Sequence, residues 1–317
     1  MSLEECRQLQ KVELHAHLNG SISLKTIQKL LDLEGANDMV PANFVLQQPT
    51  TMDEVFKMFP LIHALTRKPE ALKIATEDVI REFEEDNVVY LELRTTPKST
   101  EFMTKELYIS VILEAIQKAK LDTRLILSID RRQTIEEAQE TVKLALEDKT
   151  GLIVGVELSG NPILDGVKFI PLLQTVKNAG LGVTIHLAEL QENTSEILEF
   201  LNFQPHRIGH GTFLHANQEY IDLMDKYKIP LEICLTSNIL CKTTPTIADS
   251  HLSFWRNRGV PVAISTDDKG LMNDCNLSQE FQKAAKNLQL SITDLEEICK
   301  TSMRISFRNK KIGVIPS

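Results

Sequence analysis

The sequence predicts an α/β fold, a (β/α)8 TIM barrel that forms a single domain over residues 1–317. Eight short apolar runs recur along the chain, followed by polar residues and then by helical patterns. Near-continuous apolar runs are typical of buried parallel strands. A doubly wound sheet also alternates strands with helices, but no G-x-G-x-x-G motif follows any of these runs. A length of 317 residues allows either two small domains or one large α/β barrel, and an apolar content of 42% provides an ample core.

Each predicted strand is an apolar run that leads into polar residues. The eight runs are VELHAHL (12–18), VVYLELRTTP (88–97), RLILSID (124–130), LIVGVELSG (152–160), GVTIHLAE (182–189), RIGHGTFL (207–214), PLEICLTSN (230–238) and PVAISTDD (261–268). Between them, apolar residues recur at helical spacing. The clearest of these predicted helices are MTKELYISVILEAIQKAK (103–120), TIEEAQETVKLALED (134–148) and KFIPLLQTVKNAG (168–180). Two more, at 277–290 and 291–306, close the chain.

The connection between the first two predicted strands is unusually long, from residue 19 to residue 87. It contains three further helical patterns, SLKTIQKLLDL (23–33), TMDEVFKMFPLIHALT (51–66) and PEALKIATEDVIREFEED (69–86). Extra helices inserted at the carboxyl end of a barrel strand are expected to lie over the barrel mouth, where they can cover a bound substrate.

The composition excludes several classes of function. A net charge of −9 argues against a surface that binds a nucleic-acid polymer, although a local basic spot could still bind one phosphate. No apolar run approaches the roughly 20 residues of a membrane helix, and the segment MSLEECRQLQ has no signal-peptide core. The five cysteines are scattered and lack C-x-x-C spacing, which is typical of reduced thiols. We therefore expect a cytosolic protein whose partner is a small molecule. A monomer is also expected, although nothing in the composition determines the oligomeric state.

The segment ELHAHLNGS (13–21) indicates half of a metal site. Alternate side chains of a strand share a face, so His15 and His17 point the same way. The turn residues that follow place them at the carboxyl end of the strand. The motif alone is weak, because two polar loop residues would look the same. In a TIM barrel, however, the catalytic residues lie at the carboxyl ends of the strands, and two other predicted strands end near His186 and Asp267.

Three imidazoles and one carboxylate form a ligand set that suits one zinc ion with an open position for water. Each residue could instead have a purely structural role. His186 could be a hydrogen-bonded core histidine, His210 a turn residue between two glycines, and the pair Asp267 and Asp268 a helix N-cap. Their coincidence at one rim of the predicted barrel favours a mononuclear metal site. Its predicted ligands are His15, His17, His186 and Asp267.

The motifs ELHAHLNGS, HLAE, GHG and STDD, in this order, resemble those of the adenosine/AMP deaminase family along essentially the whole chain. KVELHAHLNGS, YLELRTTPK and LTSN are most similar to the N6-methyl-AMP deaminases of that family. The resemblance implies one Zn2+ per chain and the hydrolytic deamination of an N6-substituted purine nucleotide, with N6-methyl-AMP and water giving IMP and methylamine. The H-x-E and P-C-x-x-C signature of cytidine and tRNA deaminases is absent.

The resemblance also implies catalytic roles for residues of the rim. Glu189 matches the acid that protonates purine N1, and burial is expected to raise its pKa. His210 matches the base that orients or deprotonates the attacking water. Asp268 matches the group that holds purine N7 and this water. Gly160 matches a backbone N–H donor to purine N3, where the missing Cβ lets the base approach.

A further set of residues is expected to bind the nucleotide. The motif HLNG places Asn19 where adenosine deaminases of the family have an Asp near the ribose 5′-hydroxyl, and an amide can donate to a 5′-phosphate. Lys98 offers a positive charge, unless it is a solvated rim lysine. His63 lies in a predicted inserted helix and could instead be an exposed helix residue that does not contact the substrate. The full predicted substrate-binding set is His17, Asn19, His63, Thr95, Thr96, Pro97, Lys98, Asp130, Gly160, Glu189 and Asp268.

Three alternative functions remain open at this point. An adenosine or AMP deaminase would share the fold and the metal site. A binuclear amidohydrolase commonly has a carboxylated lysine at the end of the fourth strand, where this chain reads VELSGNP. A non-catalytic purine-binding barrel would be plausible if Glu189 or a metal ligand were lost, and none is.

Overall fold

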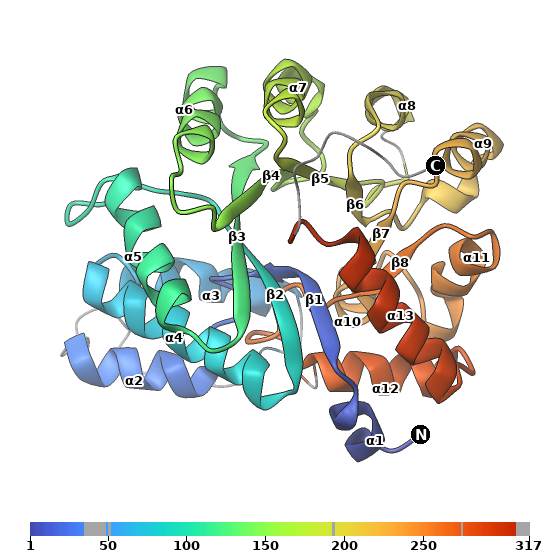
Figure 1. Ribbon diagram of the computed structural model, residues 1–317, viewed down its shortest axis with the longest axis horizontal. Coiled ribbons are helices and arrows are strands. Elements are labelled where there is room, and N and C mark those ends of the chain that lie inside the picture. The colour runs from blue at the N-terminus through green and yellow to red at the C-terminus, as the bar shows by residue number, and fades with distance from the viewer. Residues whose placement is uncertain (35–48, 50–51, 192–193, 274, 309–317) are drawn as a thin grey trace.

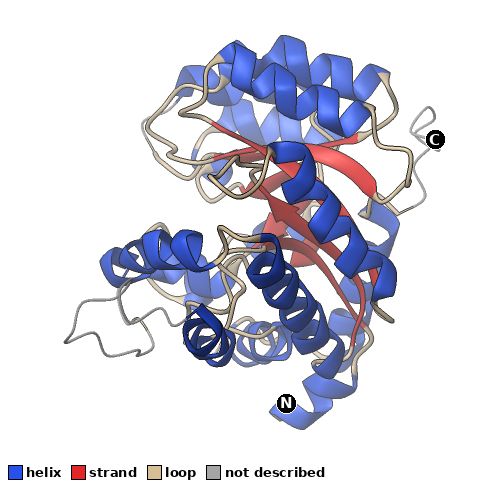
Figure 2. Cartoon of the chain, turned by 90° about the vertical axis from the view of Figure 1, so that its left-hand side faces the viewer, coloured by secondary structure: helices blue, strands red, loops and turns tan. Residues whose placement is uncertain are grey.

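The architecture is a barrel of eight parallel strands surrounded by helices (Figures 1 and 2). It is seen in a computed structural model that describes residues 1–34, 49, 52–191, 194–273 and 275–308. The strand order is β1-β2-β3-β4-β5-β6-β7-β8, which is the order of the sequence. The strands are β1 Lys11–His17, β2 Val88–Thr95, β3 Asp122–Asp130, β4 Ile153–Ser159, β5 Gly182–Leu187, β6 Arg207–His210, β7 Leu231–Ile233 and β8 Val262–Ile264. The predicted TIM barrel is confirmed.

The barrel closes where the segment after β8 meets β1. The N–H of Asp267 donates to the carbonyl oxygen of His15 at 2.8 Å, and the N–H of His17 donates to the carbonyl oxygen of Asp267 at 3.0 Å. These bonds make an isolated parallel bridge between Ala16 and Asp267. Closure therefore brings Asp267 beside both histidines of β1.

The later strands are shorter than the apolar runs predicted. The predicted run 230–238 contains only β7, because α10 (Leu235–Leu240) begins two residues after β7 ends. Ser237 and Asn238 therefore lie on a helix. In the sixth unit, His210 ends β6 with a left-handed backbone (φ 60°), a conformation that does not continue a strand.

The other helices form the outer layer of the barrel (Figure 1). They are α1 Leu3–Gln8, α5 Lys105–Lys118, α6 Ile135–Leu146, α7 Ile170–Asn178, α8 Thr194–Phe203, α9 Gln218–Tyr227, α11 Leu252–Asn257, α12 Leu277–Asn287 and α13 Ile292–Ile305. Short 3-10 helices occur at η2 Val167–Phe169, η3 Leu214–Ala216 and η4 Ile247–Asp249. Capping boxes at Thr134, Asn276 and Ser291 determine where α6, α12 and α13 begin.

The three predicted inserted helices are present between β1 and β2. They are α2 Leu24–Glu34, α3 Met52–Leu65 and α4 Pro69–Glu85. Glu82 of α4 accepts hydrogen bonds from Ser23, just before α2, at 2.6 Å and from Lys269, after β8, at 2.7 Å. The insertion is therefore tied to the segment that carries the end of the eighth strand.

The interior of the barrel contains an ionic network that the apolar runs did not predict. Arg94 of β2 forms ion pairs with Glu157 of β4 at 2.6 Å and with Glu232 of β7 at 2.9 Å. Arg207 of β6 forms ion pairs with Glu232 and with Glu92 of β2, both at 2.5 Å. All five side chains are fully buried. Because an unpaired buried charge is strongly destabilising, the network requires these strands to stay in register.

Two predictions from composition can be compared with the structure. All five cysteines lie in the described part of the chain and are free, as the scattered spacing predicted. Among the described residues, no helix has both the length and the apolar character needed to cross a membrane.

Candidate active site

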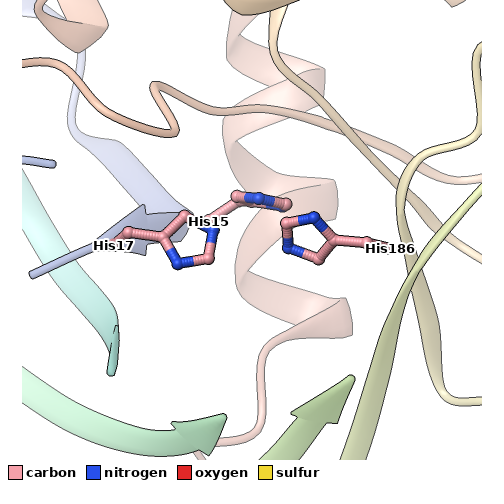
Figure 3. Close-up of side chains that lie close together, drawn as sticks. All are labelled: His15, His17 and His186. Atoms are coloured by element: carbon pink, nitrogen blue, oxygen red, sulfur yellow. The ribbon is translucent and has the colours of Figure 1, made fainter. Parts of the chain in front are cut away.

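Three histidine side chains converge at the carboxyl ends of β1 and β5. His15 and His17 come from β1 and His186 comes from β5, and their rings point toward one another (Figure 3). The ring centroids of His15 and His186 are 4.6 Å apart, and those of His15 and His17 are 5.3 Å apart. One nitrogen atom from each ring lies within 4.8 Å of the other two. The structure thus brings together three of the four predicted metal ligands.

Asp267 joins this group from the segment after β8. Its Oδ1 atom lies 3.5 Å from Nε2 of His15 and 3.4 Å from Nε2 of His17. Ligand atoms bound at about 2.0–2.1 Å to one tetrahedral zinc ion lie about 3.3–3.4 Å apart, so these distances suit a shared ion. Within the described residues, Nε2 of His15 and Nε2 of His186 are buried without a hydrogen-bond partner. The donor set and its spacing fit a metal ion.

Glu232 orients His15 from inside the barrel. Its Oε2 atom lies 2.7 Å from Nδ1 of His15, which assigns the proton to Nδ1 and leaves the lone pair of Nε2 facing Asp267. Burial alone would raise the pKa of Glu232, but the guanidinium groups of Arg94 and Arg207 hold it well below its usual range. Glu232 is not among the residues predicted from the sequence. A single Glu inside the apolar run PLEICL was a usable signal, because a buried carboxylate needs partners.

The carboxylate of Asp267 is itself held in place. The hydroxyl of Ser237 donates to Oδ2 at 2.7 Å, while Oδ1 faces the histidines. The backbone of Asp267 is left-handed, with φ 62°, and strained positions of this kind persist where the surrounding structure fixes them. Although burial opposes ionisation, the neighbouring imidazoles of His15 and His210 hold the pKa of Asp267 well below its usual range. Asp267 is therefore an anionic group facing imidazole nitrogens.

His210 and Glu189 face each other beside the metal group. Nε2 of His210 lies 3.8 Å from Oε2 of Glu189 and 3.9 Å from Oδ2 of Asp267. On the other side of the ring, Nδ1 lies 3.1 Å from Oδ1 of Asn238, which assigns the proton to Nδ1 and leaves a basic Nε2 facing the site. Asn238 is not among the site residues predicted from the sequence. Glu189 lies in the loop after β5, as predicted, and burial raises its pKa.

Asp268 lies at the same mouth, against the turn that follows β1. A Cβ atom at position 20 would lie 1.6 Å from Oδ1 of Asp268, so Gly20 is required for this close approach. Burial and the adjacent Asp267 raise the pKa of Asp268 well above its usual range. Its Oδ1 is buried and, as far as the structure describes the chain, forms no hydrogen bond. This oxygen is therefore available to a ligand.

The predicted phosphate-binding segment after β2 consists of Thr95, Thr96, Pro97 and Lys98. The hydroxyl of Thr95 lies 2.7 Å from that of Tyr108 on α5, and the side chain of Asn19 lies near the Tyr108 hydroxyl. Nζ of Lys98 lies 5.9 Å from the ring centroid of Tyr108 and is buried without a hydrogen-bond partner in the described chain. Burial lowers the pKa of Lys98 to about 8. The structure thus places Asn19 and Lys98 around Tyr108, a residue the helical pattern gave no reason to select.

The remaining predicted substrate residues are His63, Asp130 and Gly160. The His63 residue is exposed, and its pKa is lowered to about 4, first by the surrounding protein and then by the positive charges of Lys98 and Arg132. Asp130 is paired with Arg132 at 2.6 Å. Gly160 has φ 101°, and a Cβ there would lie 2.8 Å from Oδ1 of Asp130. The fold itself therefore requires glycine at position 160.

Comparisons with known proteins agree with this geometry. The family model described as adenosine deaminase matches residues 10–312. The chain is 46% identical to an adenosine deaminase-like protein of Caenorhabditis elegans, over 97% of this chain and 82% of that protein. It is 40% identical to the N6-methyl-AMP deaminase of Homo sapiens, over 95% of this chain and 89% of that protein.

Solved structures give the same result. The apo structure of the N6-methyl-AMP deaminase from Arabidopsis thaliana has a TM-score of 0.90 and 37% identity, covering 96% of this chain and 94% of that chain. A crystal structure of Arabidopsis ADAL complexed with IMP has a TM-score of 0.87 and 37% identity, with the same coverage of 96% and 94%.

Proposed function

The chain belongs to the adenosine deaminase family of metal-dependent hydrolases, and we propose that it acts as an N6-methyl-AMP deaminase. The reaction is the hydrolysis of N6-methyl-AMP to IMP and methylamine. The human and Arabidopsis relatives that carry this name cover most of the chain, and an Arabidopsis relative binds IMP. One observation in this chain supports a nucleotide in particular, namely the buried Nζ of Lys98, which has no hydrogen-bond partner among the described residues.

We propose that the metal is a single zinc ion held by His15, His17, His186 and Asp267. Three imidazole nitrogens and one carboxylate oxygen are ligands that zinc prefers, and the separations of 3.4 and 3.5 Å between Asp267 and the β1 histidines suit tetrahedral bonding. When bound, zinc supplies Lewis acidity that lowers the pKa of a water molecule from about 15.7 to about 7.

The protein's own residues then handle the protons of the reaction. His210 accepts a proton from the attacking water at Nε2, because its Nδ1 is engaged with Asn238. Glu189, with its raised pKa, donates a proton to purine N1 as the water oxygen bonds to C6. The C6–N6 bond then breaks as the departing nitrogen takes the proton held by His210. The hydroxyl on C6 gives its proton to Glu189 as the C6 carbonyl of IMP forms, and methylamine leaves. Asp268 holds purine N7 and the attacking water, for which its unpaired Oδ1 is suitably placed.

Substrate binding is divided between the two ends of the nucleotide. We propose that Gly160 donates its N–H to purine N3, and that His17 and Asp130 lie along the nucleoside. The 5′-phosphate is bound by Asn19, His63 and the Thr95–Lys98 segment. Two observations support this: Lys98 carries a positive charge, and Thr95, Lys98 and Asn19 all lie near Tyr108.

We also propose that the protein is a cytosolic, single-domain monomer over residues 1–317 and that it has no nucleic-acid or membrane partner.

A kinetic panel tests this function. The values of kcat/KM are measured for N6-methyl-AMP, AMP, N6-methyladenosine and adenosine with the metal-loaded protein. We expect N6-methyl-AMP to give the highest value. A preference for adenosine or AMP would replace the proposed substrate with that compound, and no turnover of any of the four would contradict the deaminase assignment.

A further inference from the structure

His251 is a buried imidazole that contacts the backbone of His210. It lies between η4 and α11 and is 2% exposed. Its Nε2 atom lies 2.8 Å from the carbonyl oxygen of His210. Because a carbonyl oxygen can only accept a hydrogen bond, Nε2 of His251 carries the proton and donates it. Burial lowers the pKa of His251 to about 4, so the ring is neutral near pH 7.

The carbonyl of His210 lies where the sixth strand breaks. His210 and Gly211 are successive left-handed residues, with φ 60° and 66°. The pairing of β6 with β7 extends only to Gly209, so the peptide after His210 has turned away from that neighbour. A buried carbonyl that leaves the sheet needs another donor. His251 provides this donor.

This hydrogen bond bears on the direction of the His210 side chain. A left-handed backbone is unfavourable for histidine and persists only where contacts hold it. The N–H of the same peptide, on Gly211, donates to the carbonyl oxygen of Leu187 at 3.0 Å, so His251 supplies the second of two hydrogen bonds that anchor this peptide. Displacement of the peptide would shift the Cα atom that carries the imidazole, whose Nε2 lies 3.8 Å from Glu189 and whose Nδ1 lies 3.1 Å from Asn238. A fixed backbone therefore means a fixed ring.

We propose that His251 is a positioning residue for the reaction, which holds the carbonyl of His210 so that the His210 imidazole faces the attacking water. The inference rests on the proposed function, in which His210 accepts a proton from that water. His251 contacts the backbone of His210 and is not among the proposed substrate-binding residues or metal ligands. Its loss is expected to lower kcat, while leaving KM and metal content near those of the parent protein.

Two substitutions at position 251 separate the hydrogen bond from the volume of the ring. In His251→Gln, the amide nitrogen extends about as far from the backbone as Nε2 and can donate to the same carbonyl. In His251→Asn, the amide is too short to reach it. We expect kcat of His251→Asn to fall by about 10- to 100-fold, in line with small displacements of catalytic groups, and His251→Gln to recover most of the loss.

His215 offers a matched control in the same cluster. Its ring stacks on that of His251 with centroids 5.9 Å apart and planes 9° apart. Its Nδ1 atom has no hydrogen-bond partner among the residues that the structure describes. His215→Asn therefore removes a neighbouring imidazole without removing the donor to His210, and we expect its kcat to resemble that of the parent.

The measurements are kcat, KM and zinc content of the four proteins, with a crystal structure of His251→Asn. The proposal is overturned if His251→Asn keeps the kcat of the parent, or if kcat falls equally in His251→Gln and His251→Asn. It is also overturned if the fall in kcat accompanies an equal loss of zinc. It is also overturned if residue 210 keeps its backbone and ring position in the His251→Asn crystal. The crystal structure tests the position of His210 without any measurement of turnover. If the parent protein has no deaminase activity, the proposed function is contradicted, and the crystal structure of His251→Asn still shows whether His251 holds His210 in place.

Discussion

The Oε2 atom of Glu232 lies 2.7 Å from Nδ1 of His15, and both side chains are fully buried. This pair joins the ionic network of the barrel to the metal group, because Glu232 also binds Arg94 and Arg207. A carboxylate that accepts from a ligating histidine fixes the tautomer and raises the basicity of the other ring nitrogen. The network thus serves both the stability of the barrel and the geometry of the site.

Substitution of Glu232 is expected to weaken metal binding. Glu232→Gln removes the negative charge next to His15, and zinc affinity should fall by about 10- to 100-fold in a chelator competition. Its loss also leaves Arg94 and Arg207 short of a buried partner, so the free energy of unfolding should fall by about 3–5 kcal/mol. Glu147→Gln, at a glutamate whose side chain is 62% exposed, is the control. An unchanged zinc affinity would show that Glu232 does not orient His15.

A second prediction concerns metal stoichiometry. Four converging ligands predict one zinc ion per chain, measured by elemental mass spectrometry, and loss of activity with a strong chelator. His186→Ala removes one ligand nitrogen and should lower both zinc content and turnover. Two metal ions per chain in the active protein would contradict a mononuclear site.

Glu189 allows acid catalysis to be separated from metal binding. Glu189→Gln keeps the shape of the side chain but removes the acidic proton, so kcat should fall by about 100-fold or more. Zinc content should stay at the parent level, because Glu189 is not among the proposed ligands. Activity close to that of the parent would assign the proton donor to another group.

Asn19 tests recognition of the phosphate. Asn19→Asp places a carboxylate near the proposed phosphate, and two unit charges about 4 Å apart repel by roughly 4 kcal/mol near a protein surface. Lys98 should offset part of this repulsion. We expect kcat/KM for N6-methyl-AMP to fall while that for N6-methyladenosine changes much less. If the ratio of the two values does not change, Asn19 does not contact the phosphate.

Lys98 predicts a pH dependence of nucleotide use. Burial lowers the pKa of Lys98 to about 8, so the free protein carries this positive charge below pH 8 and loses it as the pH rises through that value. The kcat/KM for N6-methyl-AMP should therefore decline above about pH 8, whereas N6-methyladenosine should show no such decline.

Two substitutions serve as controls for this pH dependence. Lys98→Arg should move the decline to higher pH, because arginine stays charged. Lys98→Met should abolish the decline and lower kcat/KM for the nucleotide at pH 7 by about 10- to 100-fold, the effect of one charged hydrogen bond. A nucleotide-specific decline near pH 8 that persists in Lys98→Met would assign it to another group.

The sequence by itself determined the barrel and the chemical types of the site residues. Eight apolar runs in one chain can all be buried if they become parallel strands, and the three inserted helices had a clear helical period. His15 and His17 share a face because strand geometry requires it, whatever the rest of the fold does. The turn residues after them placed this face at the barrel rim.

The tertiary structure alone decided which residues support these groups. Glu232 is 217 positions away from His15, and His251 is 41 positions away from His210, so no local pattern links either pair. Tyr108 appeared only as a helical residue, yet its hydroxyl lies 2.7 Å from that of Thr95 and near the side chain of Asn19. Local periodicity reports which face of an element is buried, whereas contacts between elements depend on how the closed barrel aligns its strands. Buried polar groups must find their partners across that alignment, so these contacts are fixed only when the chain has folded.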